Sequence, residues 1–201
     1  RYSPVPEDTI EIEVTLEALG ELVKAGKIRH IGLSNETPWG TMKYLELSKT
    51  HSLPRVVSIQ NAYNLVNRVF EVGLSEITNH EDVGLLSYSP LGQGILTVKY
   101  LNGQMPEGSR MALFGDGPLA YRYKSERTIR ATEMYVDIAK KYEIDPAQMA
   151  IRFCDIQPFM TSTIIGATKM TQLKACIDSI NLDLTKEILK EIDAVHRELP
   201  H

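Results

Sequence analysis

The sequence has little cysteine and no long apolar run, and both absences limit what the chain can be. Its 201 residues include two cysteines, Cys154 and Cys176, which are too few for a disulfide framework and lack metal-site spacing. We therefore expect two reduced, half-buried thiols and a reducing compartment such as the cytoplasm. No apolar stretch is long enough to span a membrane, and the first residues lack the hydrophobic region of a signal peptide.

Basic runs and nucleotide-binding glycine motifs are also missing. The formal net charge is −4, and no basic run is interleaved with aromatics, so we expect no nucleic-acid partner. No G-x-G-x-x-G follows an expected strand, which argues against a Rossmann domain, and no Walker or EF-hand pattern occurs. The five histidines show no metal spacing. The content of 43% hydrophobic and 24% charged residues suits one domain, or part of a larger one.

Apolar periodicity predicts strands and helices that alternate along the chain. Helices are expected over residues 15–25, 38–48, 69–78, 125–142, 146–156, 170–179 and 185–195, and strands over 31–33, 55–59, 83–88 and 162–165. Thr37 and Asp145 precede prolines and are predicted helix N-caps. Such alternation is typical of a parallel sheet and suits half of an eight-fold barrel, with an open four-stranded sheet as the alternative.

Polar residues follow three of these expected strands. They are Ser34-Asn35, Gln60-Asn61 and the segment from Ser87 to Pro90. Ligands gather at the carboxyl ends of parallel strands, so these residues predict one binding face. The Gly- and Pro-rich connection over residues 89–124 is too long for a simple loop, which indicates a functional or disordered segment.

Four motifs occur in a recognisable order: Gly26–Asn35, Ser58–Asn64, Tyr88–Gly94, and Ile165–Thr168 followed by Gln172-Leu173. Together they resemble the aldo-keto reductase superfamily, in its Tas-like and potassium-channel β-subunit-like branch. The resemblance covers nearly the whole chain. It implies a (β/α)8 TIM barrel of which residues 1–201 form the C-terminal half, with strands five to eight.

The resemblance also implies an activity, which is hydride transfer between NADPH and a small-molecule carbonyl substrate. The family's catalytic Asp, Tyr, Lys and His come from the first half of the barrel. No catalytic residue can therefore be assigned in this chain, and we expect the first half to come from residues outside this sequence. The alternatives are a non-catalytic NADP-binding regulatory or interaction protein and a degenerate barrel fragment; the oligomeric state is open.

Four residues match the family's nicotinamide contacts. Ser34, Asn35 and Gln60 match positions that bind the carboxamide, whose donors and acceptors allow several side chains to fix it. Tyr88 matches the aromatic residue that stacks on the ring. Taken alone, the Ser34-Asn35 pair could be a simple capping turn, and Tyr88 could be a core residue.

The remaining matches are expected to contact phosphates. Ser89, Pro90, Leu91 and Gly92 match the pyrophosphate loop, Lys99 and Arg110 match cationic contacts, and Gly166, Thr168 and Gln172 match the region of the adenosine 2′-phosphate. Three positions depart from the family: Val98 replaces a common glycine, so a different bend is expected there, while Ala175 and Cys176 replace the Glu and Asn that hold adenine.

Overall fold

The computed structural model describes residues 8–114 and 123–200. Its sheet has four strands, which are all parallel and lie in the order β1-β2-β3-β4. The strands are β1 (Ile31–Ser34), β2 (Val56–Ala62), β3 (Gly84–Tyr88) and β4 (Met160–Thr163). The predicted parallel sheet is therefore confirmed.

Helices precede and separate the strands. The α-helices are α1 (Ile12–Lys24), α2 (Pro38–Thr50), α3 (Leu74–Glu81), α4 (Arg110–Phe114), α5 (Glu126–Lys141), α6 (Pro146–Asp155), α7 (Met170–Asp178) and α8 (Lys186–Glu198). Short 3-10 turns occur at η1 (Val69–Glu71), η2 (Gly92–Thr97), η3 (Leu101–Gly103) and η5 (Ser179–Asn181).

Both predicted N-caps are confirmed. The Thr37 hydroxyl accepts a hydrogen bond from the Gly40 amide at 3.0 Å, at the start of α2. The Asp145 carboxylate accepts one from the Gln148 amide at 2.9 Å, at the start of α6. Each cap satisfies an amide that has no partner within its own helix.

The two faces of the sheet differ in their surroundings. Leu33, Ile59 and Leu85 are register neighbours on adjacent strands, and each is buried. Side chains alternate along a strand, so Ser34 points to the opposite face, where it is exposed. One face therefore packs against the core while the other is open at β1.

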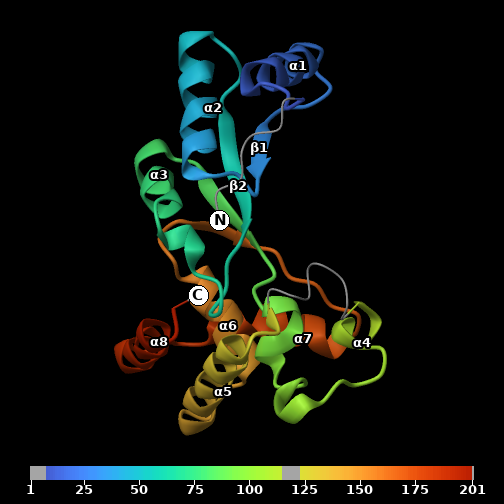
Figure 1. Ribbon diagram of the computed structural model, residues 1–201, viewed down its shortest axis with the longest axis vertical. Coiled ribbons are helices and arrows are strands. Elements are labelled where there is room, and N and C mark those ends of the chain that lie inside the picture. The colour runs from blue at the N-terminus through green and yellow to red at the C-terminus, as the bar shows by residue number, and fades with distance from the viewer. Residues whose placement is uncertain (1–7, 115–122, 201) are drawn as a thin grey trace.

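In Figure 1, α1 and α2 lie at one end of the molecule's long axis, and α5 and α8 lie at the other. Contacts of α2 with β2, α3 with β3 and α6 with β4 attach the helices to the sheet. The buried side chains form one apolar cluster that extends from Leu16 in α1 to Val195 in α8. The sheet therefore links both ends of the molecule through one core.

Two predicted elements and one burial expectation were wrong. The helix expected over 69–78 is interrupted, because Gly73 takes a φ of +104° between η1 and α3. The strand expected over 162–165 begins earlier, at Met160, because pairing with β3 starts at the Leu85 N–H, which donates to the Phe159 carbonyl. Cys154 is fully buried in α6, whereas Cys176 is half-buried as expected.

Within residues 8–114 and 123–200, no helix is both long and apolar enough to cross a membrane. The same residues contain no group of three or more His, Cys, Asp or Glu side chains arranged to hold a metal ion.

Candidate cofactor site

Register brings the predicted nicotinamide residues to one face of the sheet. Ser34 on β1 pairs with Gln60 on β2, and Gln60 pairs with Leu86 on β3. Tyr88 follows Leu86 by two residues, so its side chain projects from the same face. The sheet thus places Ser34, Gln60 and Tyr88 at the carboxyl ends of three neighbouring strands.

Hydrogen bonds connect this group through Asn35. The Tyr88 hydroxyl donates to Asn35 Oδ1 at 2.7 Å, and Asn35 Nδ2 donates to Ser34 Oγ at 3.1 Å. The backbone N–H of Asn35 donates to the backbone carbonyl of Gln60 at 3.0 Å. Asn35 has a φ of +54°, a region that asparagine tolerates better than most residues. The result is a polar cluster that offers amide, hydroxyl and aromatic groups side by side.

The predicted pyrophosphate loop begins with a tight turn after β3. Ser89 has a φ of +55°, and its carbonyl accepts the Gly92 N–H at 2.9 Å. Pro90 and Gly92 are buried, while Leu91 is half-buried. A Cβ on Gly92 would lie 2.9 Å from Ile95 Cγ2, so only glycine fits this left-handed position without a shift.

Lys99 and Arg110 lie further along the same connection, which contains η2, η3 and α4 rather than irregular backbone throughout. The Lys99 ammonium lies 5.1 Å from the centroid of the Tyr100 ring. The Tyr100 hydroxyl accepts a hydrogen bond from the Met111 N–H at 3.2 Å. Tyr100 follows Lys99 and Met111 follows Arg110, so this bond holds the two cationic residues in the same part of the connection. Burial alone would raise the Tyr100 pKa, but the bond from Met111 and interactions with Ser109 and Lys99 lower it.

We expected the backbone to bend differently at Val98, where the family commonly has glycine. The backbone of Val98 nevertheless takes a conformation that glycine favours. Val98 has φ +60° and ψ −15°, a left-handed conformation in which a β-branched residue is strained. A valine at this position therefore does not remove the left-handed turn.

The predicted 2′-phosphate residues follow β4. The Gln172 Oε1 accepts hydrogen bonds from the Thr168 amide at 3.0 Å and the Thr168 hydroxyl at 3.2 Å. This pair joins the turn to the first residues of α7, and Gly166 is exposed just before it. Ala175 uses its carbonyl to accept from Gln148 Nε2 at 3.1 Å. Burial, followed by the charge of Asp145, raises the pKa of Cys176.

Three further polar residues, to which the sequence assigned no individual cofactor contact, have buried polar atoms in the structure. Asn61 Oδ1 and Ser87 Oγ belong to register partners on β2 and β3, and both atoms are buried without a hydrogen-bond partner in the described part of the chain. Asn64 is fully buried and binds Ser89. The signal for Asn61 and Asn64 was their place in the Ser58–Asn64 motif, where only Gln60 was assigned.

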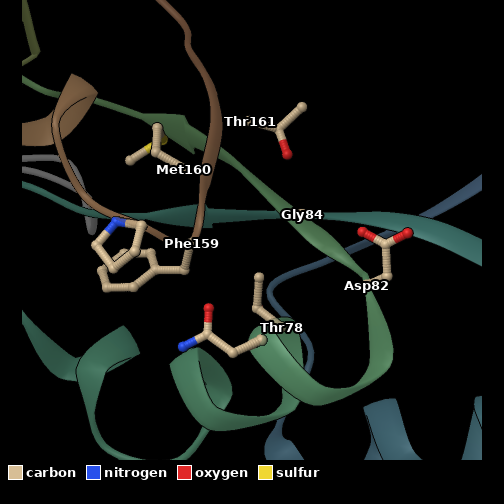
Figure 2. Close-up of a pocket in the computed structure, with 8 residues that line it drawn as sticks. Thr78, Asp82, Gly84, Phe159, Met160 and Thr161 are labelled. Atoms are coloured by element: carbon tan, nitrogen blue, oxygen red, sulfur yellow. The ribbon is translucent and has the colours of Figure 1, made fainter.

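A shallow pocket of about 260 Å³ lies at the other end of the sheet (Figure 2). Its lining includes Gly84 and Met160, the first residues of β3 and β4, together with Thr78 and Asp82. Ligand pockets are usually about 300–1,000 Å³, and active sites of (β/α)8 barrels lie at the carboxyl ends of strands. The pocket therefore lies at the end of the sheet opposite the one where ligands of parallel α/β proteins bind, and its volume is below the usual range.

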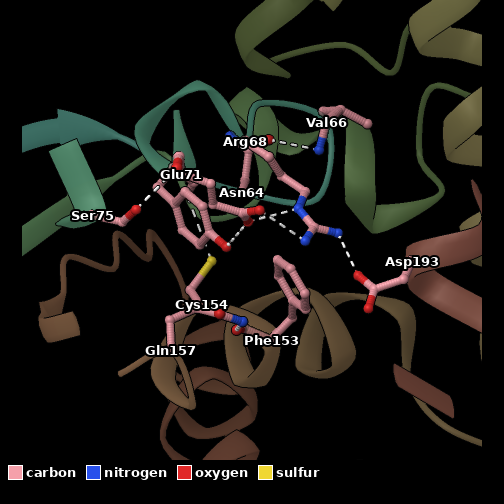
Figure 3. Close-up of polar contacts among 10 residues, drawn as sticks. Asn64, Val66, Arg68, Glu71, Ser75, Phe153, Cys154, Gln157 and Asp193 are labelled. Carbon is pink, nitrogen blue, oxygen red and sulfur yellow. Dashed lines mark hydrogen bonds and ion pairs between the residues drawn. The ribbon is translucent and has the colours of Figure 1, made fainter. Parts of the chain in front are cut away.

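A cluster of charged side chains joins the β2–α3 connection to α8 (Figure 3). Arg68 binds both carboxylate oxygens of Glu71, at 2.7 and 2.9 Å, and Asp193 of α8 at 2.8 Å. Its guanidinium lies 5.1 Å from the Phe153 ring centroid, and Tyr63 donates to Glu71 at 2.6 Å. Because each charge is paired, this cluster has the character of a structural connection and not of a vacant ligand site.

Comparison with known proteins identifies the family of the chain. The model of the aldo/keto reductase family matches residues 2–197, so the chain belongs to that family. It is 54% identical over 183 residues to "Protein tas" of Escherichia coli strain K12, which covers 91% of this chain and 52% of that protein.

More distant relatives have varied names. The chain is 32% identical to L-glyceraldehyde 3-phosphate reductase of Escherichia coli strain K12, with 96% of this chain and 56% of that protein covered. It is also 32% identical to a probable voltage-gated potassium channel subunit beta of Oryza sativa subsp. japonica, with 99% and 62% covered. The chain thus spans about half the length of both Escherichia coli relatives named here.

Proposed function

We propose that this chain is the cofactor-binding half of an NADP-dependent oxidoreductase that transfers a hydride between NADPH and an aldehyde or ketone. The observation that carries the proposal is the alignment of Ser34, Gln60 and Tyr88 on one sheet face, connected through Asn35. Membership of the aldo/keto reductase family and similarity to a protein named as a reductase support it.

The residues fit a nicotinamide cofactor. Ser34, Asn35 and Gln60 would orient the carboxamide, and the Tyr88 ring would cover one face of the nicotinamide. The buried, unpartnered oxygens of Asn61 and Ser87 lie at the same end of the strands but on the opposite face, so they do not contribute to this group. When bound, NADPH supplies the hydride; the protein's part is to select the face of the ring that meets the substrate.

Separate residues would hold the phosphates. The backbone of Ser89, Pro90, Leu91 and Gly92 permits close approach, while Lys99 and Arg110 supply positive charge. Gly166, Thr168 and Gln172 would lie near the 2′-phosphate, at the start of α7. Ala175 and Cys176 offer poor adenine contacts, so we expect each lost neutral hydrogen bond to weaken binding by about 1 kcal/mol.

We also propose that residues 1–201 form the second half of a (β/α)8 barrel. Within residues 8–114 and 123–200, the sheet edges at β1 and β4 are unpaired, and the sheet has an open face at Ser34. A preceding half barrel would pair both edges, cover that face and bring the catalytic Asp, Tyr, Lys and His. The two free thiols suit a cytoplasmic location.

A second candidate is a non-catalytic NADP-binding regulatory or interaction protein. It is favoured by the similarity to proteins named as potassium channel β subunits, and by Ala175 and Cys176.

Titration of NADPH fluorescence in the full-length protein containing this chain, followed by turnover of 4-nitrobenzaldehyde, tests both candidates. Binding with turnover is the expected result. Binding without turnover would favour the regulatory candidate, and absence of NADPH binding would reject both.

A further inference from the structure

Asn64 uses its whole side-chain amide to join three segments. Its Nδ2 donates to the Ser89 carbonyl at 2.8 Å and to the Tyr123 hydroxyl at 3.2 Å, while its Oδ1 accepts the Val66 N–H at 3.0 Å (Figure 3 shows the contact with Val66). Asn64 is fully buried. A buried amide with three partners fixes its neighbours closely, because any unmade bond costs desolvation free energy.

Asn64 lies in the connection between β2 and α3. It bonds to Ser89 and Tyr123, which both belong to the long connection between β3 and α5. Ser89 is its first residue, directly after β3, and Tyr123 lies shortly before α5. Tyr123 is buried. A Cβ on Gly92 would lie 3.4 Å from Val66 Cγ2 and 3.6 Å from Tyr123 Cε1, so the start and end of the connection pack together around the Asn64 segment.

The first part of this connection carries the two cations assigned to the cofactor phosphates. Lys99 and Arg110 are tied to one another through Tyr100, whose hydroxyl accepts the Met111 N–H. The η2 turn of this connection also packs against α5 and α6, so the bonds from Asn64 add a polar attachment at the two ends to an apolar one in between. The bond from Asn64 holds Ser89 in its left-handed conformation, at the point where the chain leaves β3.

We propose that Asn64 is a positioning residue for the phosphate-binding part of the site: by holding Ser89 and Tyr123 together, it sets where Lys99 and Arg110 lie relative to the nicotinamide cluster. The inference rests on the proposed function, since it assigns Asn64 a role in binding the phosphates of NADPH. Asn64 contacts the connection and not the cofactor.

The test compares two ligands in the full-length protein that contains this chain. NADPH reports on the whole site, and 2′-phospho-ADP-ribose reports on the phosphate and adenosine part, because it lacks nicotinamide. Asn64→Ala removes the three bonds described above, and Tyr123→Phe removes the hydroxyl that Asn64 binds while keeping the ring. Gln60→Ala serves as the reference for the nicotinamide part, and Thr132→Val, which loses one buried bond within α5, controls for destabilisation.

We expect Asn64→Ala, which loses three bonds, to raise the Kd of both ligands about tenfold, and Tyr123→Phe, which loses the bond to Asn64, to raise it about threefold. Gln60→Ala should weaken NADPH and leave 2′-phospho-ADP-ribose unchanged, and Thr132→Val should change neither. This split between ligands would not follow from lost stability alone.

Unchanged affinity for both ligands in both variants would overturn the inference. If Asn64→Ala does not fold, an unchanged Kd in Tyr123→Phe would overturn it equally. Failure of the wild-type protein to bind either ligand would instead reject the proposed function, so the two failures are distinct.

Discussion

At the scale of single residues, the nicotinamide cluster makes a direct prediction about binding. Gln60→Ala removes an amide, and Tyr88→Ala removes the ring and the hydroxyl that binds Asn35. Each should raise the Kd for NADPH, by about fivefold for Gln60 and tenfold or more for Tyr88. Fluorescence titration in the full-length protein measures this, with Lys43→Ala on the exposed face of α2 as the control. Wild-type affinity in both variants would exclude the assignment.

Arg68 matters for stability in a way that its charge alone does not indicate. Its side chain is only 11% exposed, and it pairs with Glu71 and Asp193. Arg68→Ala leaves both carboxylates without their cation, although Glu71 keeps the bond from Tyr63, and should lower the free energy of unfolding by about 3 kcal/mol. Arg130→Ala removes an ion pair of similar length whose Arg side chain is 65% exposed, and should cost less than about 1 kcal/mol. Equal losses in urea unfolding would contradict the structural role of Arg68.

At the scale of elements, the long connection is expected to store strain at Val98. Its φ of +60° suits glycine, and Val98 is 41% exposed, so we expect the relief of backbone strain to exceed the loss of its partly buried surface. Val98→Gly should therefore raise the free energy of unfolding by about 1 kcal/mol. Val72→Gly is the control, because Val72 is 78% exposed with a φ of −91° and should lose about 0.5–1 kcal/mol. A loss of stability in both variants would show that Val98 is not strained.

Helix α8 should make stability depend on pH through His196. Its Nδ1 is buried without a partner in the part of the chain that the structure describes, and burial together with Arg68 lowers its pKa. The fold therefore disfavours the protonated form, so stability is complete above the unfolded pKa of about 6.5 and falls as the pH drops through it. The wild type should lose more stability between pH 7.5 and 5.5 than His196→Gln. The exposed His80→Gln variant should keep the wild-type profile; an identical profile in His196→Gln would exclude this role.

The elements also show what the sequence could predict. Thr37 and Asp145 act within one helical turn, so their capping roles were readable from local pattern. The break at Gly73 was missed because apolar spacing continues across it. Arg68 and Asp193 lie 125 residues apart, and Asn64 and Tyr123 lie 59 apart. Such contacts depend on how the elements pack, which no local periodicity records.

At the scale of the whole molecule, the exposed edges of the sheet lead us to expect more polypeptide in the native protein than these 201 residues. Among the residues that the structure describes, β1 and β4 each pair with one strand, and unpaired edges invite association with other chains. Ser34 lies exposed on a face that a closed barrel would enclose. We therefore expect the intact mass of the protein from its native source to exceed the 22.6 kDa of this chain by about half or more. The added residues would carry the catalytic groups. A native mass near 22.6 kDa would mean a free half barrel, for which binding or regulation would be the better proposal.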